Sequence, residues 1–397
     1  MTSTRHRVAV GTAAAVGGVV TAGGLGAAGT AGYFARRVLT PDRDRPDDTL
    51  VVAVGPDTVT LGAFVQSVVP GRYGLWLQRG EGHARVGDIL ATDEEARTVT
   101  RALHGVDLGT LAPGPARWNG YYYGLDPRGS LGVAYEQVDI LTELGPMAAW
   151  LIRPEVEATG EWAVLVHGRG ARRQECLRGV KPLRDRGITV LIPSYRNDEG
   201  GPGGPDGRYN LGLSEWRDVE SAIAYAVTQG AESLVLGGWS MGGAIVMQVL
   251  ARSGLSGLVR CVVLDAPVFD WADVLAHHAR MRHLPRPVGD LSRVMMGNRW
   301  GRRLVGVHEA IDVAQTDWVT RADELRLPML VIHSVDDEFV PVGPSQALAR
   351  ARPDLVTFPA WSVARHAKEW NTAPERWERE VSDFVGSIRP SGAPSTG

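Results

Sequence analysis

The stretch "SLVLGGWSMGGAIVMQVL", residues 233–250, constrains the fold of this chain most, because it joins two apolar segments through glycines and a single serine. Residues 233–236 are short, apolar and partly β-branched, which is typical of a buried parallel strand. From Met241 the apolar residues recur at helical spacing, and Gly254 stands where a helix-ending glycine is expected. We therefore expect a strand to pass directly into a helix at Ser240.

Two glycines at equal distance from Ser240 characterise this junction. Gly238 and Gly242 each lie two residues from the serine, where a sharp strand-to-helix turn leaves no room for a Cβ atom. The pattern G-x-S-x-G predicts a nucleophile elbow, which presents the serine hydroxyl at the carboxyl edge of the sheet. The N-terminus of the following helix favours a developing negative charge there. The five residues alone also fit a glycine-rich turn with a capping serine, so the remaining motifs must decide.

The second half of the chain alternates strands with helices. Beyond Glu161, apolar strand-like segments are separated by segments of helical periodicity, which indicates parallel strands joined by helical crossovers. This pattern predicts an α/β fold with a doubly wound, mostly parallel sheet, whose ligands bind at the carboxyl ends of the strands. The predicted strands are residues 162–168, 188–195, 233–239, 260–267, 328–334 and 355–360.

Charge and cysteine content exclude two classes of function. The 397 residues carry a formal net charge of −3, so no extended basic surface for nucleic acid is expected. The two cysteines, Cys176 and Cys261, have no metal-type spacing and lie in apolar segments. We expect them to be buried free thiols rather than a disulfide or a metal site.

The N-terminal segment is unusual because Val8–Ala35 contains no charged side chain and is flanked by basic residues on both sides. As one helix, these 28 residues would cover about 42 Å, more than the roughly 30 Å of a bilayer's hydrocarbon core. We therefore expect segment 1–39 to be a single-pass membrane anchor, and arginines at both ends leave its orientation open. A signal peptide cleaved near Ala31, which would make the protein secreted, and a disordered leader are the alternatives.

The region between this segment and the α/β part is expected to form a separate unit. Residues 40–49 are proline-rich and charged, which is typical of a solvated linker. Residues 50–140 follow as short β-type runs separated by glycines, and they predict a small antiparallel, β-rich unit. At the other end of the chain, residues 389–397 are expected to be a disordered tail.

A serine nucleophile needs a base and an acid that orients the base, and two loops supply candidates. The segment "HSVDDEFVP" offers Asp336 and Asp337, and the segment "ARHAKEWN" offers His366. Each segment follows a predicted strand, so both loops lie at the same edge of the sheet as Ser240. The chain order serine, aspartate, histidine is the one expected of an α/β hydrolase.

With these motifs in this order, residues 141–388 resemble the α/β-hydrolase superfamily. The acid loop of that family reads His-Gly-x-x-Asp-x-x-Val-Pro, and alignment on its histidine and its Val-Pro pair implies that Asp337 is the acid. Ser334 stands where the family has glycine. The histidine of the family precedes the last helix, which implies that His366 is the base, although Arg365 replaces the usual glycine before it.

The resemblance extends to the groups that stabilise the reaction intermediate. The segment "VLVHGRG" resembles the oxyanion strand and turn of the family. It implies that the backbone amides of Arg169 and Met241 together hold the oxyanion. Asp265 is the alternative acid, because some relatives take the acid from the strand that ends there.

The resemblance also implies a helical lid at about residues 269–306, which follow the strand after which the family usually places one. One interpretation is a mobile cap that lines the pocket, and the other is a cap whose methionines pack inward while its arginines face water. Among the branches of the superfamily, the resemblance is nearest to membrane-associated depalmitoylase-like and monoacylglycerol-lipase-like enzymes.

The chemistry predicted from these residues is acyl transfer to water. Ser240 attacks a carbonyl carbon, His366 takes the hydroxyl proton and later protonates the leaving group, and Asp337 fixes the imidazole. The expected substrate is a small-molecule or lipid-like acyl ester or thioester, and no metal or organic cofactor is called for. A serine peptidase with the same triad and a non-catalytic, hydrolase-like binding protein are the alternatives.

Overall fold

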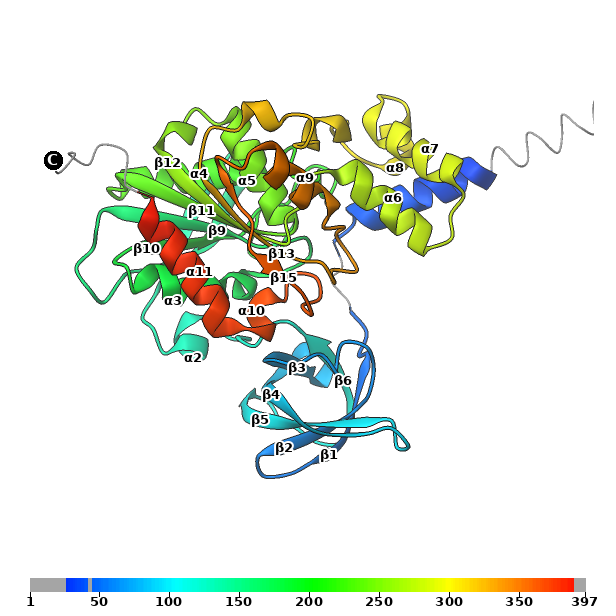
Figure 1. Ribbon diagram of the computed structural model, residues 1–397. Helices are drawn as coiled ribbons and strands as arrows, with labels where there is room; N and C mark the ends of the chain where they lie inside the picture. Colours follow the sequence, from blue (N-terminus) through cyan, green and yellow to red (C-terminus); the bar gives the residue numbers. More distant parts are fainter. Residues whose placement is uncertain (1–25, 42–44, 389–397) are drawn as a thin grey trace, which may run out of the picture.

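Two β structures, a small closed barrel and a large sheet, organise the chain (Figure 1). The computed structural model describes residues 26–41 and 45–388. The barrel comes first in the sequence and lies below the α/β unit in the view of Figure 1. The polypeptide then enters the large sheet, and most of the helices of the chain follow in its second half.

The barrel consists of antiparallel strands with inward apolar side chains. Within residues 45–388 these strands are β1 (Thr49–Val54), β2 (Thr58–Gly62), β3 (Tyr73–Leu77), β4 (Gly82–Asp93), β5 (Thr98–Leu108) and β6 (Gly114–Asn119). Their spatial order is β1-β2-β5-β4-β3-β6, and pairing of β1 with β6 closes the barrel. In β2, Val59 and Leu61 are buried while their neighbours are partly exposed, as the two-residue period of a strand requires. The predicted β-rich unit is therefore a closed barrel.

The large sheet carries the predicted parallel strands. Its strands in the described chain are β7 (Glu136–Thr142), β8 (Gly145–Ile152), β9 (Glu161–Val166), β10 (Thr189–Pro193), β11 (Ser233–Trp239), β12 (Val259–Asp265), β13 (Met329–Ser334), β14 (Val356–Thr357) and β15 (Ala360–Trp361). The order is β7-β8-β10-β9-β11-β12-β13-β14, with β15 also paired to β13. The hairpin β7–β8 and the pair β8–β10 are antiparallel, and the other pairs are parallel. Strand β11 is buried along its whole length, because helices cover both faces of the sheet.

Helices on both faces complete the doubly wound arrangement. Helices α4 (Trp216–Thr228), α5 (Met241–Arg252) and α9 (Gly343–Ala351) pack on one face and share its hydrophobic core. Helices α3 (Val180–Arg184) and α11 (Pro374–Ser387) pack on the other face. The short helices α2 (Pro127–Leu131) and α10 (Glu369–Thr372) lie on the side of the α/β unit that faces the barrel (Figure 1).

A helical insertion separates β12 from β13, as predicted for the lid. It contains α6 (Trp271–Met281), α7 (Arg286–Gly297) and α8 (Gly301–Val305). Met295 and Met296 are buried in the core, whereas Met281 and Trp300 are exposed. The lid thus packs two of its methionines inward, as the second interpretation of this segment expects.

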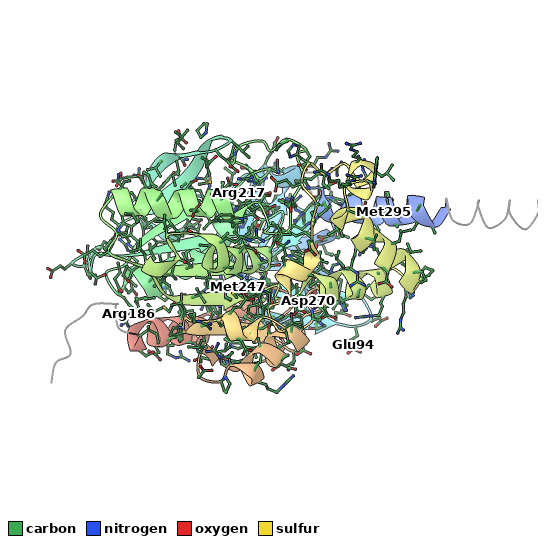
Figure 2. The ribbon with its side chains drawn as sticks, turned by 90° about the horizontal axis from the view of Figure 1, so that it is seen from above. Glu94, Arg186, Arg217, Met247, Asp270 and Met295 are labelled. Atoms are coloured by element: carbon green, nitrogen blue, oxygen red, sulfur yellow. The ribbon has the colours of Figure 1, made fainter. Side chains whose placement is uncertain are left out.

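The end of the uncharged N-terminal segment belongs to a helix, residues 26–39, that packs against the lid. Phe34 and Leu39 are buried in the same core as the lid, and the Ser292 hydroxyl of α7 donates a hydrogen bond to the carbonyl oxygen of Ala31 at 3.1 Å. Figure 1 shows this blue helix beside α6 and α7, and Figure 2 shows Met295 next to it. Protein side chains therefore bury one apolar face of this helix.

The structure bears on the predicted boundaries in two ways. In the described ranges, 26–41 and 45–388, no helix is both long and apolar enough to cross a bilayer. The predicted anchor stays untested, because residues 1–25 lie outside those ranges, as do residues 42–44 of the predicted linker and the predicted tail. The predicted boundary between residues 140 and 141 is wrong, because it falls within β7, which pairs with β8 in the large sheet.

Candidate active site

Ser240 stands at the junction of β11 and α5 in a backbone conformation that residues with side chains rarely adopt. Its φ is 53° and its ψ is −116°. A Cβ atom on Gly238 would lie 2.7 Å from the backbone of Gly242, and a Cβ atom on Gly242 would lie 2.1 Å from the carbonyl oxygen of Val166. The glycines are required because α5 begins in direct contact with β9, and the junction has the geometry predicted for an elbow.

His366 links Ser240 to Asp337 through two hydrogen bonds. The Ser240 hydroxyl lies 2.9 Å from Nε2 of His366, and Nδ1 of His366 lies 2.7 Å from Oδ2 of Asp337. The carboxylate accepts from Nδ1–H, which leaves Nε2 as the acceptor of the serine proton. The Asp337 side chain is 0% exposed and that of His366 is 18% exposed. The structure therefore brings together the three residues that the sequence predicted as nucleophile, base and acid.

The surroundings of Asp337 keep its carboxylate ionised. Its Oδ1 accepts hydrogen bonds from the backbone N–H groups of Phe339 and Val340, at 2.8 and 2.9 Å. Burial by itself would raise the pKa of Asp337, but His366 and His333 outweigh it and hold the pKa well below its usual range. Burial has the opposite effect on His366, because it would lower the pKa of the imidazole. The charge and hydrogen bond of Asp337 outweigh this effect and raise the pKa of His366 above its ordinary value. The pair is thus suited to stabilise an imidazolium that forms during reaction.

The two other acid candidates have different partners. Asp336 accepts a hydrogen bond at 2.6 Å from a backbone N–H in the loop that precedes His366, so it supports this loop from the side. Asp265 is buried, and its Oδ2 accepts from the indole N–H of Trp377 at 2.7 Å. Burial raises the pKa of Asp265 and of its neighbour Glu369, so this carboxyl pair holds protons more readily than an exposed pair. Neither Asp336 nor Asp265 has a hydrogen bond to the His366 ring.

The two residues predicted for the oxyanion site lie next to Ser240. Met241 is the first residue of α5, and the first N–H groups of a helix have no acceptor within the helix. Arg169 belongs to the turn after β9 and lines the same cavity as Ser240. The preceding residue, Gly168, donates its N–H to a carboxylate oxygen of Glu175 at 2.6 Å, which fixes the turn. The sequence motifs missed Glu175, because it belongs to no motif and only the fold places it here.

A cavity of about 590 Å³ opens above Ser240 and His366. The lid helix α6 contributes the apolar side chains Trp271, Val274 and Leu275 to its wall. The barrel contributes other wall residues, among them Arg117 and Trp118 on β6. A further part of the wall comes from the end of the N-terminal helix. The reacting groups therefore lie where the sheet, the lid, the barrel and the N-terminal helix meet.

Comparison with known proteins identifies the family. Residues 163–385 match the model described as "Alpha/beta hydrolase family". The chain belongs to the α/β hydrolase family. The predicted superfamily and the predicted α/β-hydrolase fold with a helical lid are thereby confirmed. Residues 50–119, which include almost the whole barrel, match a model described as "Domain of unknown function (DUF8805)".

Individual relatives of this α/β hydrolase are distant. Over 226 residues the chain is 25% identical to a pimeloyl-[acyl-carrier protein] methyl ester esterase from Aromatoleum aromaticum. This match covers 48% of this chain and 85% of that protein. A solved esterase from Pyrococcus furiosus is 19% identical with a TM-score of 0.51, covering 66% of this chain and 94% of that one. An acylaminoacyl peptidase from Pyrococcus horikoshii is 15% identical with a TM-score of 0.51, and the match covers 89% of this chain and 58% of that one. The solved structures show the fold, and the predicted depalmitoylase-like or monoacylglycerol-lipase-like branch stays a prediction.

The side chain of Arg169 connects the oxyanion turn of the hydrolase to the N-terminal helix. Its guanidinium donates to the carbonyl oxygens of Val38 at 2.6 Å, Thr40 at 2.9 Å and Arg37 at 3.1 Å. It also lies over the ring of Tyr209, 5.5 Å from the ring centroid. A cation is favourable at a helix C-terminus, where the last carbonyl groups have no partner within the helix. This contact orients the turn that carries the Arg169 amide.

The barrel also contacts the loop that carries His366, a role that the sequence did not reveal. The Lys368 ammonium donates to the Gln66 side-chain oxygen at 2.6 Å, and the Asn371 side chain donates to the carbonyl oxygens of Arg72 at 2.5 Å and Gly120 at 2.8 Å. Lys368 and Gln66 are 302 residues apart, so no local sequence pattern could signal their contact. The barrel and the catalytic loop thus form one continuous structure.

Proposed function

We propose that this protein is a serine esterase, which hydrolyses carboxylic esters or thioesters of small or lipid-like acyl groups through an acyl-enzyme intermediate. The observation that carries the proposal is the continuous hydrogen-bond chain from the Ser240 hydroxyl through His366 to the ionised Asp337 carboxylate. The strained elbow supports it, because such backbone conformations concentrate at reactive residues. The named activity of the Aromatoleum relative, hydrolysis of a methyl ester, supports an ester as the substrate.

In the proposed mechanism each group has a role in the first half of the reaction. The Ser240 oxygen attacks the carbonyl carbon while its proton moves to Nε2 of His366. The negative charge that develops on the carbonyl oxygen is held by the backbone N–H groups of Arg169 and Met241, each worth about 3 kcal/mol in comparable enzymes. The alcohol or thiol then leaves with the proton from Nε2, and the acyl group remains on Ser240.

The second half of the reaction uses the same groups with water as the nucleophile. His366 takes a proton from the water, whose oxygen attacks the acyl carbon. The intermediate collapses, the proton returns to the Ser240 oxygen, and the carboxylic acid is released. Asp337 stays ionised throughout and stabilises the imidazolium in both halves.

Labelling with a fluorophosphonate probe, together with ester turnover, tests this proposal. We expect the wild type to be labelled and active, and Ser240→Ala to lose both the label and turnover while it melts at the wild-type temperature. Ser221→Ala, a change on helix α4 away from the cavity, is the matched control and should keep both. A folded Ser240→Ala protein that retains turnover would show that another group is the nucleophile.

A pair of substrates with one acyl group distinguishes ester from peptide chemistry. We expect the 4-nitrophenyl ester to be hydrolysed far faster than the 4-nitroanilide of the same acid. Faster cleavage of the anilide, or of an acyl peptide, would assign the protein to the peptidases instead.

A further inference from the structure

The wall of the catalytic cavity has two chemically different sides. On the lid side, Trp271, Val274 and Leu275 present apolar surface. On the side of the barrel and the linker, the wall includes the cationic side chains of Arg45, Arg117 and Lys368. Among the described residues that line the cavity, seven are arginine or lysine and only three carry carboxylates. A cavity with this excess of cations attracts negatively charged molecules.

Lys368 is a cation of this wall whose ammonium is held by a neutral side chain. Its ammonium has three N–H donors, and its hydrogen bond goes to the neutral side-chain oxygen of Gln66 at 2.6 Å. In the described ranges, no carboxylate oxygen lies within 4.0 Å of this ammonium. Burial lowers the pKa of Lys368 to about 8, and the more distant Glu338 offsets this only in part. Placing a cation in such surroundings is costly unless an anion joins it.

Other cations of the wall are held by groups of the protein itself. Arg178 donates to the carbonyl oxygen of Ala367 at 2.7 Å and pairs with Glu175 at 3.6 Å. Arg282 donates to the carbonyl oxygen of His278 and lies over the ring of Phe34. These two side chains support the loop and the lid. The Lys368 ammonium uses one of its three N–H donors within the described chain, and Lys368 lies two residues after His366 in the same wall.

We propose that Lys368 is the anion-binding residue of the substrate pocket and that the preferred ester carries a carboxylate or phosphate group. The anionic group lies on the barrel side at Lys368, and the apolar part of the substrate packs against the lid residues Trp271, Val274 and Leu275. Arg117, whose Nε is buried and has no hydrogen-bond partner in the described chain, adds positive charge on the same side. This assignment rests on the proposed esterase function and gives the barrel a role in substrate selection.

Matched neutral and anionic esters test the assignment in the full chain. One pair, 4-nitrophenyl pentanoate and the 4-nitrophenyl hemiester of glutaric acid, places the carboxylate on the acyl side. A second pair, phenyl acetate and 4-acetoxybenzoate, places it on the leaving group. The spontaneous rates of hydrolysis are subtracted first. We then expect the wild type to prefer the anionic ester of one pair by about tenfold or more in kcat/KM. The pair that shows this preference identifies the side of the ester that carries the anion.

Three variants then ask whether Lys368 causes the preference. Lys368→Met should abolish the preference mainly through the KM of the anionic ester, and Lys368→Arg should keep much of it. Lys181→Met is the control, because Lys181 pairs with Asp185 on the surface of α3 and its change should leave both rates unaltered. A preference that survives in Lys368→Met would overturn the assignment. An equal loss of kcat on the neutral and the anionic ester would also overturn it, because it would give Lys368 only a structural role through Gln66.

A measurement on the wild type alone keeps the proposal testable if Lys368→Met does not fold. Pentanoate should inhibit hydrolysis of the neutral ester competitively and at least about tenfold more strongly than pentanamide, its neutral analogue. Equal inhibition by the carboxylate and the amide would refute an anion site. Failure of the anion site would leave the esterase proposal standing, because that proposal is contradicted by other results, namely turnover retained in a folded Ser240→Ala protein or faster cleavage of the anilide.

Discussion

The guanidinium of Arg169 donates to the carbonyl oxygen of Val38 at 2.6 Å and so ties the turn after β9 to the end of the N-terminal helix. The same helix contacts the lid through the hydrogen bond from Ser292 to Ala31. The segment at residues 26–39 therefore bridges the lid and the turn next to Ser240. A helix in this position stabilises the geometry of the candidate active site as well as the fold.

The packing of this helix predicts a large difference between two adjacent aromatic residues. Phe34 is 3% exposed and belongs to the main core, whereas Tyr33 is 71% exposed. Phe34→Ala should lower the free energy of unfolding by about 3 kcal/mol, because it leaves a cavity between the helix and the lid. Tyr33→Ala should change it by less than about 0.5 kcal/mol. Urea denaturation of both variants measures the difference, and equal stabilities would show that the helix does not pack in solution as described.

The sequence could not reveal this packing, because an uncharged run can be buried by a bilayer or by protein and periodicity alone does not separate the two. Val8–Ala35 reads as one segment in the sequence, yet its last ten residues lie in the helix at the lid. The contacts that show burial by protein, such as the hydrogen bond from Ser292 to Ala31, join residues 261 positions apart. Long-range contacts of this kind are visible only in the folded chain.

The elbow and the order of the reacting residues, by contrast, could be predicted because local sterics and spacing determine them. Gly238 and Gly242 are needed wherever a strand turns this sharply into a helix, so the sequence pattern reports the geometry directly. The resemblance of the loop to the acid loop of the family implies Asp337 rather than Asp336, and the structure places Asp337 against His366. The part of the barrel in the cavity wall had no such local signal.

Neutralising Asp337 should affect turnover far more than neutralising its neighbour. Asp337→Asn removes the charge that stabilises the imidazolium and favours the wrong tautomer of His366, a change that costs about 10⁴ in kcat in a comparable triad. Asp336→Asn keeps an oxygen that can accept from the histidine loop, so it should cost less than about tenfold. Steady-state kinetics with a neutral ester compare the two. A larger loss of kcat in Asp336→Asn than in Asp337→Asn would mean that Asp336, and not Asp337, is the acid.

The pKa of His366 predicts the pH dependence of the reaction. The base must be neutral to accept the serine proton, so kcat/KM should rise with pH through the pKa of His366 and then level off. Because Asp337 raises that pKa, the midpoint should lie above the ordinary histidine value of about 6.5. The rate of fluorophosphonate labelling should follow the same curve, since it also needs the neutral base. Midpoints at or below the ordinary value in both profiles would contradict the charge coupling between His366 and Asp337.

The close approach at the elbow predicts that one methyl group is enough to disable the site. A Cβ atom on Gly242 would lie 2.1 Å from the carbonyl oxygen of Val166 and 2.7 Å from that of His167, and neither backbone atom can move without shifting β9 away from α5. Gly242→Ala should therefore lower the melting temperature, at a cost of about 1–3 kcal/mol or more, and move Ser240 away from His366.

The matched control is Gly254→Ala beyond the end of α5, where an added Cβ would meet no atom within 4 Å. This change should leave turnover at the wild-type level and stability equal or slightly higher, because alanine restricts the unfolded chain more than glycine does. Melting curves and ester turnover of the two variants provide the comparison. A Gly242→Ala protein with wild-type stability and activity would show that β9 and α5 are farther apart than the structure places them, and the elbow would then need no glycine at this position.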